Sequence, residues 1–263
     1  MILDRIAPIR SALQTLSSIV WLLVETVQET GEHMVRGRAP FRLSIFFEQT
    51  DRAGVGSVPL VALVSLFLGL TMALLTGYQL RTFGTERLVP GLVAVGFTRE
   101  LGPLITGIML AARVGAAYTA ELGTMTVAEE VEAIEAMGIG PLRFLVSPRV
   151  LAVFFLMPCL VVISNATALF GAMLISRLQF NISLPYFIDL VHDSLQTRDI
   201  VAGVIKSFLF GLIIGMVACF KGLTVRGGAA GVGDATTSSV VMAITTVIGF
   251  DTLMNIVLVA LYD

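Results

Sequence analysis

Long apolar stretches divide the chain into segments that are each long enough to cross a membrane. Two of these stretches, residues 53–80 and 150–176, contain no Asp, Glu, Lys or Arg. Both exceed the roughly 20 residues that a helix needs to cross about 30 Å of hydrocarbon. The pattern therefore predicts an all-α fold, a polytopic membrane bundle of about five transmembrane helices. The expected spans cover residues 55–79, 89–117, 150–176, 200–220 and 237–262.

The region before the first span has a different pattern. Within residues 1–30, apolar residues recur at spacings of three and four, and charged residues flank them, which favours an amphipathic helix lying on the membrane. A soluble helix packed on another chain would show the same pattern. We therefore divide the chain into an N-terminal interfacial region, residues 1–52, and a transmembrane domain, residues 53–263. Gly54, Gly56 and Pro59 allow the first span either to cross fully or to bend back.

A short acidic helix is expected between the second and third spans, at about residues 126–138. Thr126 and Glu129 have the spacing of a capping box, and Gly138 would end the helix. Such a helix is too short to span a membrane, so it could dock into a groove on a partner or be an ordinary solvated helix. Apolar residues share one face and acidic residues cover the rest: Val127, Val131 and Ile134 against Glu129, Glu130, Glu132 and Glu135.

Two other segments between spans also have recognisable patterns. Apolar residues after the third span favour a short amphipathic helix at the outer interface: Leu184, Ile188, Val191 and Leu195. Four glycines after the fourth span favour a flexible loop: Gly227, Gly228, Gly231 and Gly233.

Composition agrees with a membrane protein and excludes several other classes. The chain is 56% hydrophobic and 14% charged, whereas soluble domains carry about 25% charged residues. A net charge of −2 gives no reason to expect a nucleic-acid partner. The two cysteines lie in apolar runs and the two histidines are far apart, so no metal site is expected. No phosphate-binding loop motif is present, so ATP would have to be bound by another chain.

Basic residues predict the orientation of the chain, because cytoplasmic segments are enriched in Lys and Arg. With the N-terminus in the cytoplasm, eleven basic residues fall on the inner side and four on the outer side. An odd number of spans then places the C-terminus outside. The inner set is Arg5, Arg10, Arg36, Arg38, Arg42, Arg52, Arg113, Arg143, Arg149, Lys221 and Arg226, and the outer set is Arg81, Arg87, Arg177 and Arg198.

Four charged residues fall inside the expected spans, where an ionised group is costly unless it is paired. They are Arg99, Glu100, Lys206 and Asp251. At 1.5 Å per residue, Glu100 and Asp251 lie roughly 16 Å from the outer ends of their helices and Lys206 roughly 10 Å. Glu100, Lys206 and Asp251 could therefore meet in a network beside a cavity. An ion pair that only fixes the register of the helices is the alternative.

Several motifs resemble the MlaE/YrbE family of ABC transporter permeases. The central ones are Thr98–Pro103 (TRELGP), Ala112–Gly123 (ARVGAAYTAELG) and Glu135–Arg143 (EAMGIGPLR), followed by Ser147–Arg149. Shorter matches are Ile205–Ser207, Ala235–Thr237 and Gly249–Asp251. The similarity extends from about residue 60 to the C-terminus.

The resemblance implies a homodimeric permease of a lipid transporter, with phospholipid as the expected cargo. It also implies two partners: a cytoplasmic P-loop ATPase, which would bind the ATP, and a periplasmic protein with an MCE domain. The host membrane would be a bacterial inner membrane or a plastid inner envelope. A secondary transporter, a channel and a non-transporting scaffold are the alternatives.

The resemblance also assigns roles to residues. Arg99 and Glu100 are expected near a lipid cavity, together with Leu70, Leu74 and Tyr78 of the first span. The helix at residues 126–138 is expected to couple the spans to the ATPase. The coupling residues would be Glu121, Thr126, Glu129, Glu132, Glu135 and Met137.

Overall fold

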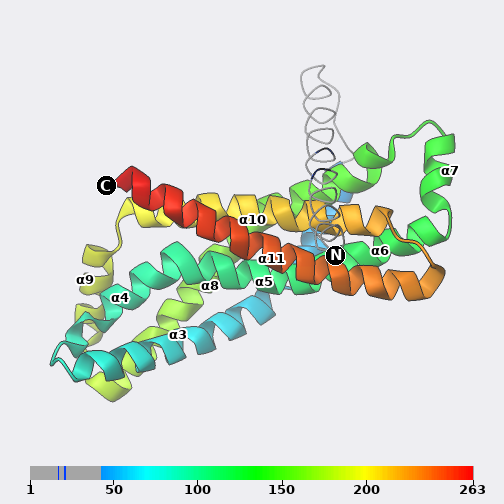
Figure 1. The fold of residues 1–263 in the computed structure, drawn as a ribbon. Helices are drawn as coiled ribbons and strands as arrows, with labels where there is room; N and C mark the ends of the chain where they lie inside the picture. Colours follow the sequence, from blue (N-terminus) through cyan, green and yellow to red (C-terminus); the bar gives the residue numbers. More distant parts are fainter. Residues whose placement is uncertain (1–16, 18–20, 22–42, 263) are drawn as a thin grey trace, which may run out of the picture.

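The fold is a bundle of long helices, as a computed structural model shows for residues 17, 21 and 43–262 (Figure 1). Five helical segments in this part are long and apolar enough to cross a membrane, which confirms the expected number. Their bounds are Ile45–Arg81, Glu86–Val127, Leu142–Phe180, Thr197–Leu223 and Gly228–Leu258. The amphipathic helix expected within residues 1–30 lies outside the described residues, except for Ser17 and Trp21.

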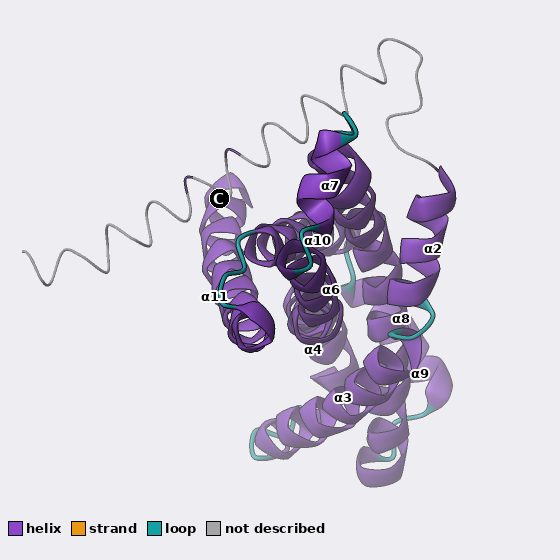
Figure 2. Cartoon of the chain, turned by 90° about the vertical axis from the view of Figure 1, so that its right-hand side faces the viewer, coloured by secondary structure: helices purple, strands orange, loops and turns teal. Residues whose placement is uncertain are grey.

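Two ends of the bundle are distinguished by short helices (Figures 1 and 2). The helix α7, Glu130–Ala136, lies at one end, and α9, Leu184–Ser194, lies at the other end, where α11 also finishes. We call these the α7 end and the α9 end. The other helices outside the second span are α2 (Leu43–Gly54), α3 (Val58–Arg81), α8 (Ser147–Phe180, preceded by the π-helical turn η4, Leu142–Val146), α10 (Thr197–Leu223) and α11 (Gly228–Tyr262).

Within the first segment, α2 ends at Gly54 and α3, which we take as the first span, is one continuous helix of 24 residues, so it does not bend back. At 1.5 Å per residue it is about 36 Å long, which is enough to cross the membrane. Its buried stripe faces α8 and consists of small residues at every fourth position: Val61, Ser65, Gly69, Ala73 and Gly77. A side chain at Gly69 would collide with the carbonyl of Ala168, and Ser65 and Ser164 share a hydrogen bond of 2.7 Å. Small residues therefore set the close approach of these two helices.

The second span is interrupted by two π-helical turns. It runs through η1 (Glu86–Leu88), α4 (Val89–Gly96), η2 (Phe97–Leu101), α5 (Gly102–Leu110), η3 (Ala111–Gly115) and α6 (Ala116–Val127), of which η2 and η3 are π-helical. The sequence prediction ended this span at residue 117, ten residues too early. No proline lies between Ala117 and Val127, and the helix continues through Gly123 toward the α7 end.

The expected capping box at Thr126 and Glu129 is wrong. Thr126 belongs to the last turn of α6, where its hydroxyl lies 2.8 Å from the carbonyl oxygen of Leu122 and 3.2 Å from that of Gly222. Glu129 precedes α7 in a left-handed conformation, with φ of 59°, and makes no side-chain cap. The short helix itself is present, but it covers only Glu130–Ala136, and Gly138 follows it with φ of 75°.

The two other segments between spans are partly as expected. α9 is present, and the expected stripe is divided: Leu184 and Ile188 are exposed, whereas Val191 packs together with Phe187 against α3, α4 and α8 residues. The glycine segment forms a loop only up to Gly228, where α11 begins. Gly231 lies inside this helix and packs against the carbonyl of Arg226, which precedes the helix. The prediction of a loop through Gly233 is therefore wrong.

Candidate functional site

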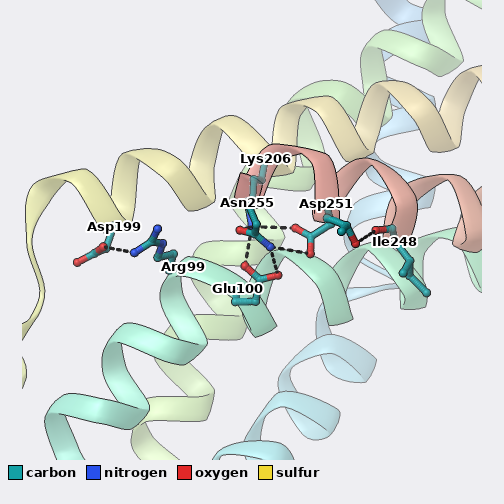
Figure 3. Close-up of polar contacts among 8 residues, drawn as sticks. Arg99, Glu100, Asp199, Lys206, Ile248, Asp251 and Asn255 are labelled. Atoms are coloured by element: carbon teal, nitrogen blue, oxygen red, sulfur yellow. Dashed lines mark hydrogen bonds and ion pairs between the residues drawn. The ribbon is translucent and has the colours of Figure 1, made fainter. Parts of the chain in front are cut away.

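A network of charged and polar side chains lies inside the bundle, where η2, α10 and α11 meet (Figure 3). The ammonium nitrogen of Lys206 lies 2.6 Å from Oε2 of Glu100 and 2.8 Å from Oδ1 of Asp251. Lys206 also donates a hydrogen bond of 2.7 Å to Oδ1 of Asn255. The Asn255 amide donates to Oε1 of Glu100 at 2.8 Å, so the four side chains form one connected group.

The members of this network differ in exposure. The side chain of Lys206 is fully buried, that of Asp251 is 7% exposed and that of Glu100 is 33% exposed. The contact between Lys206 and Oδ1 of Asp251 is an ion pair without hydrogen-bond geometry. Two carboxylates therefore share one ammonium, and Glu100 is the carboxylate that can reach a ligand from outside the bundle.

The backbone explains why these residues meet. Gly203 of α10 lies against the carbonyl of Thr98, a contact that leaves no room for a side chain. Lys206 follows three residues later on the same face of α10, which places it beside Glu100. Asp251 and Asn255 are four residues apart, so both project from one face of α11. The π-helical turn η2 carries Glu100, and such turns are frequent at functional sites.

Arg99 and Glu100 are neighbours in sequence but have different partners (Figure 3). Arg99 lies 3.9 Å from Oδ1 of Asp199, near the start of α10. Asp199 is 7% exposed in its side chain, and its other oxygen accepts a hydrogen bond from the backbone N–H of Gln196 in a capping box. Arg99 is therefore held toward the α9 end, while Glu100 is held inside the bundle.

The three residues of the first span that were expected near a lipid cavity lie on α3. Leu70 and Leu74 are half-buried, and Tyr78 is 69% exposed. The structure thus brings Glu100, Lys206 and Asp251 together, whereas Leu70, Leu74 and Tyr78 are not part of the polar network. Their expected role in a lipid cavity stays a prediction.

The residues expected to couple the protein to an ATPase occupy two places at the α7 end. Glu129, Glu132, Glu135 and Met137 are exposed on and around α7, while Val131 and Ile134 pack inward. Glu121 lies on α6, and its Oε1 is 3.1 Å from Arg149 of α8 and 3.7 Å from Arg52 of α2. Thr126 joins α6 to α10 through Gly222, so Glu121 and Thr126 connect α6, the helix that precedes α7, to α2, α8 and α10.

Sequence reasoning missed Asn255, Asp199 and the buried Arg149. Asn255 carries no charge, so a search for charged residues in spans passes over it, but its position one turn after Asp251 was a usable signal. Asp199 and Arg149 lie at the ends of spans, where charged residues are common. Only the folded structure shows that Arg149, 4% exposed, points inward.

Comparison with known proteins identifies the family. Residues 46–257 match the family described as Permease MlaE. The chain belongs to the MlaE permease family. Its match covers all of the charge network and α7, and it agrees with the resemblance seen in the sequence motifs.

Similar proteins occur in bacteria and in plants. A Rickettsia felis protein named as a probable ABC transporter permease is 39% identical over 206 residues, covering 78% of this chain and 79% of that protein. A Synechocystis protein with the same description is 32% identical over 241 residues, covering 90% and 91%. The Arabidopsis thaliana protein TRIGALACTOSYLDIACYLGLYCEROL 1, chloroplastic, is 36% identical over 211 residues, covering 80% of this chain. The match spans 60% of the length of the Arabidopsis protein.

Proposed function

We propose that this MlaE permease forms the membrane-spanning part of an ABC-type lipid transporter whose cargo is a phospholipid. Two copies of the chain would enclose the lipid path, a cytoplasmic P-loop ATPase would supply the energy, and a periplasmic MCE-domain protein would exchange lipid with the permease. The observation that carries the proposal is the network of Glu100, Lys206, Asp251 and Asn255. A charged group of this kind inside a membrane bundle is costly and marks a path for polar cargo.

The geometry supports a specific role for the network. The partly exposed Glu100 would contact the polar head group of the lipid, while the buried Lys206 holds the glutamate in place. Leu70, Leu74 and Tyr78 would line the apolar part of the path. Arg99 would contact the head group nearer the α9 end, where Asp199 orients it.

Coupling to the ATPase would use α7. Its exposed acidic side chains fit a basic groove on a partner, because opposite charges steer association. A movement of α7 would reach α10 through Thr126 and Gly222, and α8 through Glu121 and Arg149. In this proposal the α7 end lies in the cytoplasm and the α9 end outside. The host membrane would be a bacterial inner membrane or a plastid inner envelope.

Reconstitution of the chain with its co-purifying partners into proteoliposomes tests the proposal. The transfer of fluorescent phospholipid from the proteoliposomes to an acceptor protein is measured with and without ATP. Glu100→Gln should abolish most of the ATP-dependent transfer, whereas Glu48→Gln, at an exposed glutamate of α2, should leave it unchanged.

Other results would indicate other functions. Transfer driven by an ion gradient, without an ATPase, would favour a secondary transporter or channel. Normal transfer by Glu100→Gln would favour a scaffold that only anchors a partner. The absence of both a co-purifying ATPase and bound phospholipid, after gentle extraction, would also contradict the proposal.

A further inference from the structure

A second polar site lies at the α7 end of the bundle, away from the charge network. It is a pocket of about 460 Å³ between α2 and the η3–α6 part of the second span. Arg52, Arg113, Tyr118 and Glu121 line it, and the rest of its wall is small and apolar. Arg113 is thirteen residues after Glu100, which corresponds to about 20 Å along the helix. The pocket is therefore distinct from the site of Glu100.

Positive charge exceeds negative charge around this pocket. The single carboxylate, Glu121, pairs through one oxygen with Arg149 at 3.1 Å and with Arg52 at 3.7 Å. Arg113 makes no ion pair with any residue between 43 and 262. Within residues 43–262, the three guanidinium groups of Arg52, Arg113 and Arg149 therefore share one carboxylate, which leaves an excess of two positive charges. An anion in the pocket would balance them.

Buried donors beside the pocket lack partners. The Tyr118 side chain lines the pocket and the residue is only 3% exposed, yet its hydroxyl has no hydrogen-bond partner in the described part of the chain. The Nε of Arg149, whose guanidinium lies 5.8 Å from the centre of the Tyr118 ring, also lacks one there. Buried polar groups in folded proteins nearly always have partners. Ligand oxygen atoms would provide an acceptor for the tyrosine.

The level of the pocket in the membrane indicates the kind of anion. A side chain at Gly56, in the turn between α2 and α3, would lie 2.5 Å from Nη2 of Arg113. The Arg113 guanidinium therefore rests on the backbone just before Val58, where the first span begins. The beginning of a spanning helix lies where hydrocarbon gives way to lipid head groups. Lipid phosphates occupy this level.

We propose that the pocket binds the phosphate group of an anionic phospholipid from the leaflet at the α7 end. Arginine matches phosphate well, because its planar guanidinium can donate two parallel hydrogen bonds. The two uncompensated charges favour a lipid with net negative charge over a zwitterionic one. This lipid site is additional to the transport path of the proposed function and does not depend on an ATPase partner.

Titration of the full-length chain, purified in mild detergent and washed free of lipid, tests the proposal. The probes are dioctanoylphosphatidylglycerol, dioctanoylphosphatidylcholine and inorganic phosphate, with binding followed by native mass spectrometry. Phosphatidylglycerol should bind more tightly than phosphatidylcholine. Arg113→Gln should weaken its binding about tenfold and Tyr118→Phe about fivefold, the effect of losing one charged or one neutral hydrogen bond.

Two control variants separate this site from other sources of affinity. Arg226→Gln removes an exposed arginine from the same end of the bundle and should leave binding unchanged. Glu100→Gln should remove only the lipid bound in the transport path and leave the binding that depends on Arg113 in place, so a failure of the transport proposal can be told from a failure of this one. Size-exclusion profiles and melting temperatures establish that each variant is folded.

The outcomes are distinct. Binding of inorganic phosphate that depends on Arg113, as tight as that of the lipid, would support the phosphate site but assign it to the free ion. Equal binding of both lipids, equal weakening by Arg226→Gln, or no binding by the folded wild-type chain would each overturn the proposal. The last result would mean that another group, such as a carboxylate of this chain or a partner, fills the pocket.

Discussion

The ammonium nitrogen of Lys206 and the carboxylate of Glu100 lie 2.6 Å apart, although 106 positions separate the two residues in the chain. Lys206 is fully buried, and Asp251 on a third helix contacts the same nitrogen. Glu100, Lys206 and Asp251 therefore hold the second, fourth and fifth spans together at one point. Its geometry leads to predictions about stability as well as transport.

Removal of the lysine should destabilise the bundle strongly. Lys206→Met leaves Glu100 and Asp251 close together without a cation, and breaking a buried ion pair from one side costs about 3–5 kcal/mol. We expect a lower melting temperature of the detergent-solubilised protein. The double variant Lys206→Met/Glu100→Gln should recover part of the loss. An unchanged melting temperature for the single variant would show that the network does not hold the helices together.

Asn255 should matter although it carries no charge. Asn255→Leu removes the donor to Oε1 of Glu100 and the acceptor for Lys206, so Glu100 loses its orientation. An unsatisfied buried group costs about 1–3 kcal/mol. We expect reduced lipid transfer in the proteoliposome assay. Thr252→Val, at an exposed position on the same helix, is the control, and equal activity of the two variants would contradict this role.

Charge reversal on α7 should release the ATPase. Glu132→Lys/Glu135→Lys places positive charge on the exposed face of α7, opposite a groove that we expect to be basic. The amount of ATPase that co-purifies with the tagged chain should fall, while membrane insertion stays normal. Asp189→Lys/Asp193→Lys makes the same charge change on exposed positions of α9. Normal co-purification with the α7 variant would exclude the proposed docking.

The contact between α3 and α8 should not tolerate a larger residue. Gly69→Ala would place a methyl group against the carbonyl of Ala168, and overpacking of this kind costs about 1–3 kcal/mol. The melting temperature should fall. Gly249→Ala adds the same methyl group to α11 where nothing lies within 4 Å of it, so this variant should be as stable as the wild type or slightly more stable. Equal effects would mean that helix propensity, not packing, decides.

The sequence predicted the number of spans correctly because the apolar stretches are long and almost free of charge. It also predicted which charges could meet, since straight helices convert residue number into depth at 1.5 Å per residue. Glu100, Lys206 and Asp251 have similar depths by this count, and the structure places them in contact. Depth gives no direction around a helix axis, however, so it could not show that Arg99 turns toward Asp199 instead.

Two local predictions were wrong because tertiary contacts override the sequence signals on which they rested. Thr126 and Glu129 have the spacing of a capping box, but the Thr126 hydroxyl reaches carbonyl oxygens of α6 and α10, and the helix does not begin there. Gly231 looked like a loop residue, but it lets α11 pack closely on the carbonyl of Arg226. Asn255 was missed because a search for charged residues does not select an uncharged amide, and only the structure shows its partners Glu100 and Lys206.

The dependence of Lys206 on α11 sets an order for biosynthesis. The ribosome completes α10 before it has made Asp251 and Asn255, so a nascent chain at that stage has only Glu100 to pair with the lysine. Lipid offers no alternative counter-ion in its hydrocarbon layer. The network is therefore complete only after the last helix has been synthesised, and we expect a chain cut short before residue 251 to be less stable in the membrane.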